Sequence, residues 1–536
     1  MLDAPAPVPE QPTAYTPAGP SDPLIFENFE GINTATTRPG VDDKQMAWCD
    51  GFIPLGPRRN LRTLYGVGPL LWTAPATVVF MQFANIGTTP IKISILSDGS
   101  IWQVNTSTAV ATQIAIPGTI LSPTQLNVGI SQYGAQYVQI VAKQTNGYFI
   151  WDGATFYSPG GVSPTGGTMP LAIGGTGIEN YAGRVWIING ATTTFSAPGA
   201  IDDFSSGSGG GNFTSSDSFL RTRYVQIKQT NGFLYLIGDS SVNYISGVQT
   251  SGSPPVTTFT NQNADPEVGT PWPNTVDVFN RNILFANSFG AHVSYGGAVT
   301  KISEALDGVY NTVPNFGNLI PSAAKAIIFG KKVWMLLLSI IDPITSLQVN
   351  KLMMWNGKQW WASQQDIPLT FIQFQEIDSE LTAWGTDGTS VYPLFQQPST
   401  GFQKIVQSRL WDPPGGFQFL HVAVRLWILA VYYNFLGASL AVSIDNENAL
   451  ANSQNVAITI GPTAVVWTNN SNAVVPWTNN SAAPVTWYTS GTSFVLSPPQ
   501  AIGKSGVLTG LTITTSAADM ALISAMMQDT IGGYRG

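Results

Sequence analysis

Cysteine and histidine are nearly absent from this sequence of 536 residues. The single cysteine, Cys49, excludes an internal disulfide, and two histidines, His292 and His421, are too few for a His-rich metal site. Neither histidine lies near a nucleophile elbow, so we expect both to be packed or bonded within turns. The sequence therefore predicts no metal site, no cofactor, and neither zinc nor redox chemistry.

Charged residues are also scarce, at 10% of the chain against about 25% in an ordinary globular protein. The 43% hydrophobic content and 16 tryptophans exclude disorder over most of the length. Because few charges are available to cover the surface, we expect identical subunits or other partners to cover part of it. The net charge of −8 argues against tight phosphate binding, so any contact with nucleic acid is expected to be weak.

Long apolar runs are missing as well. The longest, from Leu426 to Val442, is shorter than the roughly 20 residues of a membrane helix and is interrupted by Asn434 and Gly437. It predicts two buried strands and no membrane-spanning segment. The N-terminus lacks the basic start and apolar core of a signal peptide, so folding in the cytoplasm is expected.

What the sequence has in abundance is turn residues and short apolar runs. From about residue 75, runs typical of strands alternate with Gly, Asn, Asp and Ser turns. One aromatic residue, taken to lie in the first strand of each unit, recurs at separations of 49, 35, 49, 50, 49 and 50 residues: Trp102, Trp151, Trp186, Tyr235, Phe285, Trp334 and Trp384. This period predicts an all-β fold, a β-propeller with six or seven blades.

The same pattern divides the chain into four segments. Residues 1–24, with seven prolines, predict an extended arm, and residues 25–74 an N-terminal docking segment. Residues 75–400 are assigned to the β-propeller. After residue 400 the spacing is lost, and residues 401–536 predict a β-rich platform domain that contains one short helix at 518–527.

One group of carboxylates is a candidate for chemistry. Glu376, Asp378 and Glu380 alternate, so on a strand they would share one face and supply the paired carboxylates of a glycoside hydrolase. Asp378 and Ser379 more strongly predict a hairpin turn, because turns favour these residues. We therefore predict no catalytic residues.

Two groups are candidates for binding. Trp467, Trp477 and Trp487 recur every ten residues and predict an aromatic ladder, either an anchor in a core or interface, which we favour, or a platform for sugar stacking. A basic trio consists of Arg58, Arg59 and Arg62. We expect it to contact an acidic neighbouring subunit, with DNA phosphates as the alternative.

Several short motifs occur in a characteristic order. A Gly-Ile-Asn-Thr opening is followed by a Gly-x-x-Ser-Val strand and then by a tryptophan-rich segment; they fall on Gly31, Ile32 and Asn33, on Gly238 and Ser241, and on Trp355, Trp360 and Trp361. In this order and spacing the chain resembles the tail hub or nozzle proteins of short-tailed bacteriophages, which include the packaged-DNA stabilisation proteins. The likeness covers roughly residues 29 to 400.

The resemblance implies a β-propeller with an added β platform, assembled as a hexameric ring below the portal and the head-to-tail adaptor. Tail fibres, spikes or a needle would attach to its outer surface or tip. Its channel would extend the portal–adaptor conduit, retain the packaged genomic DNA and pass it during ejection. The expected protein is thus a structural component of the virion tail and not an enzyme. The residues alone leave open a carbohydrate- or receptor-binding β-propeller.

Overall fold

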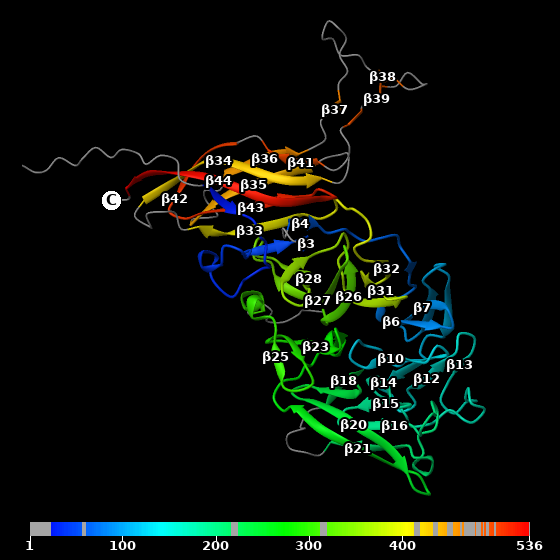
Figure 1. The fold of residues 1–536 in the computed structure, drawn as a ribbon. Coiled ribbons are helices and arrows are strands. Elements are labelled where there is room, and N and C mark those ends of the chain that lie inside the picture. The colour runs from blue at the N-terminus through cyan, green and yellow to red at the C-terminus, as the bar shows by residue number, and fades with distance from the viewer. Residues whose placement is uncertain are drawn as a thin grey trace, which may run out of the picture.

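A computed structural model describes residues 23–55, 60–215, 223–310, 319–411, 419–432, 438–447, 454–460, 464–465, 477–478, 484–485, 487–488, 493–497 and 500–534. This part of the chain is almost entirely β, and its one α-helix, α1 (Asp307–Tyr310), is a single turn. None of its helices is long and apolar enough to cross a membrane. Figure 1 shows a ring of small sheets with larger, layered sheets on one side of it.

The ring is built from seven units of four antiparallel strands that follow one another along the chain. The innermost strand of each unit contacts that of the next, and the innermost strand of the seventh contacts that of the first, so the ring is a closed seven-bladed propeller. Blades 1 to 4 contain β6 (Val78–Ile86), β7 (Thr89–Leu96), β8 (Ile101–Asn105) and β9 (Ala111–Ala115); β10 (Val128–Tyr133), β11 (Tyr137–Ala142), β12 (Tyr148–Trp151) and β13 (Phe156–Tyr157); β14 (Gly177–Tyr181), β15 (Arg184–Asn189), β16 (Thr192–Phe195) and β17 (Gly211–Thr214); and β18 (Tyr224–Thr230), β19 (Phe233–Gly238), β20 (Val242–Ser251) and β21 (Val256–Asp265). Blades 5 to 7 contain β22 (Asp277–Phe279), β23 (Asn282–Asn287), β24 (Gly290–Ser294) and β25 (Val299–Lys301); β26 (Ser322–Ile328), β27 (Lys331–Ile341), β28 (Gln348–Trp355) and β29 (Trp360–Ser363); and β30 (Phe371–Ile377), β31 (Glu380–Thr386), β32 (Ser390–Pro393) and β5 (Trp72–Thr73).

The propeller prediction is confirmed, with seven blades. Each of the seven aromatic residues lies in a different blade, although in a second or third strand and not in the first as expected. Trp102 and Trp151 lie in third strands, whereas the five from Trp186 onward lie in second strands. The shorter interval of 35 residues, between Trp151 and Trp186, reflects this change from the third strand to the second.

Blade 7 is completed by a strand from the start of the ring. β5 pairs with β32 through Trp72 and Val391, which closes the ring.

A buried lysine lies where the ring closes. The Trp72 ring lies 5.7 Å from that of Trp102 in blade 1, and the Nζ atom of Lys92 lies 4.3 Å from the Trp72 centroid. Lys92 is fully buried, and its Nζ has no hydrogen-bond partner in the described part of the chain. Burial lowers the pKa of Lys92 to about 7.

The platform is a sandwich of two sheets. One sheet is shared with blade 6 and runs from β26 through β29 into β2 (Trp48–Asp50), β33 (Lys404–Trp411), β43 (Thr509–Thr515), β35 (Ala438–Asn446) and β36 (Gln454–Ile460). The other contains β1 (Leu24–Phe26), β3 (Phe52–Leu55), β4 (Asn60–Thr63), β34 (Phe419–Tyr432), β41 (Ser493–Leu496), β42 (Gln500–Gly506) and β44 (Met520–Tyr534). Phe26 of one sheet packs edge-on against Trp411 of the other, and a single core of buried residues joins both sheets to blade 6. Two short ribbons, β37 (Ala464–Val465) with β40 (Trp487–Tyr488) and β38 (Trp477–Thr478) with β39 (Pro484–Val485), belong to the same C-terminal region.

The short helix predicted at 518–527 is wrong, because this segment begins β44. β44 lies between β34 on one side and β1 and β4 on the other, and Met520, Leu522 and Met527 are completely buried. Ala, Leu and Met favour helices in isolation, but tertiary pairing overrides that weak preference.

The propeller and the platform join where β2 pairs with both β29 and β33. Asp50 of β2 forms a buried ion pair with Lys351 of β28, and the Lys351 Nζ atom lies 2.7 Å from Asp342 Oδ2. Burial opposes ionisation of Lys351, yet the two carboxylates raise the pKa of its ammonium. Burial also acts against the Asp342 carboxylate, but hydrogen bonding to Lys351 outweighs it and lowers the pKa of Asp342. The junction thus holds one buried cation between two buried acids.

Replacing Lys351 with methionine is expected to lower the free energy of unfolding by about 3–5 kcal/mol, because two buried carboxylates lose their counter-charge. Urea denaturation followed by tryptophan fluorescence measures this loss. The matched control is Lys301→Met, which removes a partly exposed pair with Asp307 and should cost less than about 1 kcal/mol. An equal loss of unfolding free energy in Lys351→Met and Lys301→Met would contradict the prediction that the buried charges at the junction matter more than a partly exposed pair.

Replacing Lys92 with methionine is expected to stabilise the protein near neutral pH. Since the pKa of Lys92 is about 7 in the folded chain and 10.5 in an unfolded one, the unfolded state binds more protons between these values, and stability rises with pH across that window. Each unit of pKa difference corresponds to about 1.4 kcal/mol. Thermal unfolding of both proteins at several pH values should show this rise in the wild type and its loss in Lys92→Met. Parallel pH profiles would refute the assignment.

Candidate functional site: the two faces of the propeller

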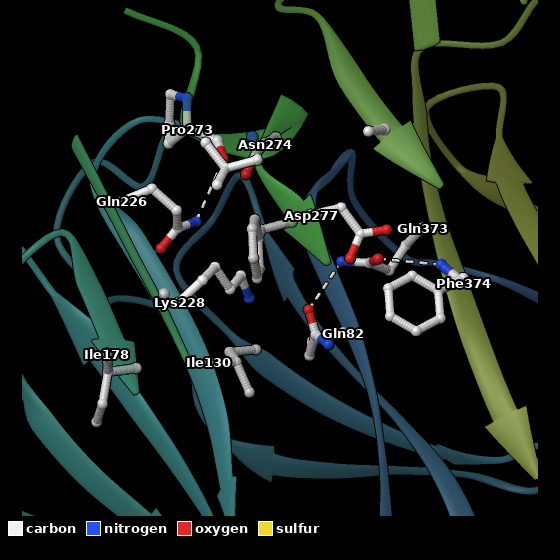
Figure 2. Close-up of a pocket in the computed structure, with 14 residues that line it drawn as sticks. Gln82, Ile130, Ile178, Gln226, Lys228, Pro273, Asn274, Asp277, Gln373 and Phe374 are labelled. Atoms are coloured by element: carbon white, nitrogen blue, oxygen red, sulfur yellow. Dashed lines mark hydrogen bonds between the residues drawn. The ribbon is translucent and has the colours of Figure 1, made fainter. Parts of the chain in front are cut away.

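The propeller axis holds a small polar cavity, shown in Figure 2. Residues from all seven blades line it. The Nε2 atom of Gln373 donates to Oε1 of Gln82 at 2.8 Å, and Lys325 lies 3.3 Å from Asp277 and 3.9 Å from the Phe374 centroid. The cavity has a volume of about 50 Å³, room for a few water molecules only. The axis is therefore filled by side chains and is no conduit for a macromolecule.

One end of the axis is crossed by the connection from β9 to β10, residues 116–127. The side-chain amide of Asn274, near blade 5, donates to the backbone carbonyl of Gln125 at 3.1 Å. On the other side, Gln144 of blade 2 accepts a hydrogen bond from the backbone N–H of Leu121. We call this end of the propeller the bridged face. The connection spans its centre from blade 2 to blade 5.

The connection separates two grooves on the bridged face. The larger, of about 750 Å³, is lined by Pro123 to Gln125 and by turns of blades 1, 6 and 7, and Asp387 is the one ionisable residue among the residues that line it. The smaller, of about 230 Å³, lies against blades 2 to 5 and includes Lys143 and Arg223. Amide and hydroxyl side chains such as Gln125, Asn350 and Thr370 line the larger groove beside a larger apolar surface, so it suits an uncharged ligand or a peptide.

The opposite end of the blades carries a different surface. A cavity of about 470 Å³ lies between β3 and the turns that begin β27 and β29, and it is lined by Pro54, Asn280, Gly330, Lys331, Lys332, Asn356, Gly357, Lys358 and Gln359. No carboxylate is among these residues. Arg281 is exposed in the same turn as Asn280. We call this cavity the basic pocket.

The structure places Arg62 within the chain's own packing. Its guanidinium lies 3.1 Å from Asp519 and 4.0 Å from the centroid of Phe329, so it links β4 and the end of the platform to the β26–β27 turn. Arg58 and Arg59 lie outside the described residues. The intersubunit role of the trio therefore stays a prediction.

The tryptophan ladder also stays a prediction. Trp477 and Trp487 lie in different ribbons, paired with Val485 and Val465, and Trp467 lies outside the described residues. The hairpin turn at Asp378 and Ser379 is confirmed, since both residues have positive φ between β30 and β31. Its neighbours Glu376 and Glu380 are exposed at the tip.

His292 is packed, as expected. Its Nε2 lies 3.1 Å from Asn287 Oδ1, and its ring stacks on Phe285. Burial lowers its pKa to about 4, so the ring is neutral at physiological pH. The side chain of His421 lies outside the part that the structure describes.

Two of the three motifs behind the family resemblance meet at the junction. The backbone N–H of Ile32 donates to the carbonyl of Trp360 at 2.8 Å, and that of Met46 donates to Gly31 at 2.9 Å. Gly31 has φ of 100°, and a Cβ there would lie 3.2 Å from the Trp360 carbonyl, so the close approach requires glycine. Trp360 stacks on Trp355. Gly238 and Ser241 lie apart from these residues, at the β19–β20 turn, where the Gly238 N–H donates to the Ser241 carbonyl.

No protein-family profile matches the sequence, and no curated protein does. Among solved structures, the chain is similar to BBS1N, crystallised in complex with ARL6DN, at 11% identity and a TM-score of 0.37, over 62% of this chain and 98% of that one. It is similar to BamB from Moraxella catarrhalis at 10% identity and a TM-score of 0.35, over 64% and 96%. Raptor from Chaetomium thermophilum matches at 8% identity and a TM-score of 0.37, over 62% and 30%. At these scores the likeness indicates nothing about function, and the propeller assignment depends on the strand order above.

Sequence reasoning missed both faces. The bridging connection has no motif, because it is held by hydrogen bonds from blades 2 and 5, one of them between residues 149 positions apart. The basic pocket did leave a signal, the adjacent lysines after the Phe329-Gly330 turn, but Asn280 and Lys358 join them only through the blade arrangement.

Replacing Asn274 with alanine is expected to loosen the bridging connection, because a net loss of about 1 kcal/mol accompanies removal of one such hydrogen bond. Hydrogen exchange of the backbone amides at 121–127 should become severalfold faster. The exposed Asn212 on β17 supplies the control, Asn212→Ala. Unchanged exchange in Asn274→Ala would show that other contacts hold the connection.

Proposed function

We propose that this protein is a structural subunit of a homomeric ring, the tail nozzle or hub of a short-tailed bacteriophage. In this proposal the ring extends the portal–adaptor conduit, retains packaged DNA and passes it during ejection, and the protein is not an enzyme. Its partners are further copies of itself, the adaptor and portal above, and fibres, spikes or a needle outside. Its location is the virion tail.

The observation that carries the proposal is the contact between Gly31–Ile32 and Trp360. Two motifs that are more than 300 residues apart, and that resemble those of the nozzle family, pack against each other where the propeller joins the platform. Gly31 has a φ of 100° and a Cβ there would lie 3.2 Å from the Trp360 carbonyl, so this position strongly favours glycine. The low charge of the chain also supports the proposal, because neutral surface suits contacts between subunits and a wall that DNA slides past.

The geometry adds one constraint. The axial cavity of the propeller, with about 50 Å³, cannot pass DNA, so the proposed conduit lies between subunits and not within one. Each subunit would then contribute an outer surface to the channel wall. The continuous sheet from blade 6 to β36 makes propeller and platform one rigid wall element in this scheme.

A second candidate is a carbohydrate- or receptor-binding propeller. The larger groove of the bridged face favours it, because its lining is almost uncharged and rich in amide and hydroxyl groups. Such groups bind sugar hydroxyls directly.

Negative-stain electron microscopy with native mass measurement tests the two candidates on the purified full chain, alone and with the portal and adaptor of its source. The nozzle proposal predicts a closed ring, sixfold by the family resemblance, with a central opening as wide as duplex DNA. A monomer that ignores portal and adaptor yet binds on a glycan array would overturn it in favour of the second candidate. Glycan binding lost on filling the larger groove, with Thr370→Trp, would place the sugar site there.

A further inference from the structure

The basic pocket gathers positive charge that the chain itself leaves without an ion pair. Eight cations of the described residues are paired with acids of the same chain: Arg38, Arg62, Arg223, Lys228, Lys301, Lys325, Lys351 and Arg409. Lys331, Lys332 and Lys358, which line the pocket, are exposed, and none of them forms an ion pair within the described part. Lys332 lies 5.2 Å from the centroid of Phe279, which ties the turns of blades 5 and 6 together. A cavity whose charged lining residues are all positive, in a chain of net charge −8, indicates an acidic partner.

We propose that the basic pocket binds the acidic, proline-rich N-terminal arm, residues 1–22, of a second copy of this chain. The inference rests on the homomeric assembly of the proposed function. The arm contains Asp3, Glu10 and Asp22 and no lysine, arginine or histidine, so its charge is complementary to the pocket. In a polyproline conformation, a segment of 22 residues would span up to about 68 Å, which is enough to reach a neighbour.

The chemistry of the pocket suits such a segment. Lysine ammonium groups pair with the arm's carboxylates. A polyproline segment forms no internal hydrogen bonds, so its backbone carbonyls need donors from outside. The side-chain amides of Asn280, Asn356 and Gln359 line the same cavity and can supply them.

The direction of β1 favours a second copy over the chain's own arm. Leu24 pairs with Met527 of β44, Phe26 with Ala525, and Leu61 of β4 with Leu522. Along β44, Leu24 is thus farther from β4 than Phe26 is. β4 pairs with β3, and Pro54 of β3 lines the basic pocket, so the chain enters β1 at the end that lies farther from the pocket. The N-terminal end of β1, at Leu24, therefore points away from the pocket of its own chain.

Zero-length carbodiimide cross-linking of the full chain tests the proposal, because the reagent joins a carboxylate to an adjacent lysine. Isotopically light and heavy copies are mixed, assembled and digested, and the linked peptides are identified by mass spectrometry. We expect mixed light–heavy links between the arm acids and Lys331, Lys332 or Lys358. They should fall at least tenfold at about 1 M salt, where the screening length is about 3 Å.

A pocket variant, Lys331→Glu/Lys332→Glu/Lys358→Glu, removes the linkable amines as well as the charge, so its readout is the mass distribution of the assembly. It should dissociate at lower salt than the control Lys44→Glu/Lys143→Glu, which changes exposed lysines elsewhere. Links within one label only would mean that each arm binds its own chain, and would overturn the proposal. So would an absence of arm links in a sample whose Lys44 and Lys143 still react.

The remaining outcomes separate this inference from the proposed function. A ring seen by microscopy without arm links would refute the arm contact alone, whereas mixed links without a ring would refute the nozzle alone. Loss of binding to a short DNA duplex in the pocket variant, with no arm links in the wild type, would assign the pocket to nucleic acid instead.

Discussion

The pairing of β2 with both β29 and β33 is the constraint on which the rest of the structure depends. Propeller blades normally end in a short outer edge, and an uncovered edge of hydrogen-bonding groups is prone to pair with other chains. Here the outer edge of blade 6 is continued by β2, so nine strands form one sheet across two bodies. The relative position of propeller and platform is therefore set by backbone hydrogen bonds and not by a flexible linker.

The buried Asp50–Lys351–Asp342 group adds selectivity to this pairing. Buried ion pairs contribute little net stability, because desolvation offsets much of the attraction, but an uncompensated member costs several kcal/mol. An arrangement in which β2 slips along β29 would separate Asp50 from Lys351 and leave charges unpaired in the core. We infer that the group penalises wrong registers more than it strengthens the correct one.

The sequence allowed the fold class to be predicted because blade repetition appears in the spacing of single aromatic residues such as Trp102 and Trp334. It did not allow the fourth strand of blade 7 to be found, since β5 is two residues long and lies before the repeats. A helix was wrongly predicted at 518–527 because these residues favour helices in isolation. They form a strand because they pair with β34, β1 and β4. The basic pocket could be predicted only in part: Lys331 and Lys332 are adjacent in the sequence, but Asn280 and Lys358 come from turns that join them only in the fold.

The placement of β44 has a consequence for synthesis. β1 and β4, at the start of the described chain, pair with β44 at its end, and the Thr63 hydroxyl donates to the Met520 carbonyl across 457 positions. The propeller can close while the ribosome is still translating, but the second platform sheet lacks its central strand until β44 emerges. A chain that stops before β44 would thus contain a closed propeller with an unfinished platform.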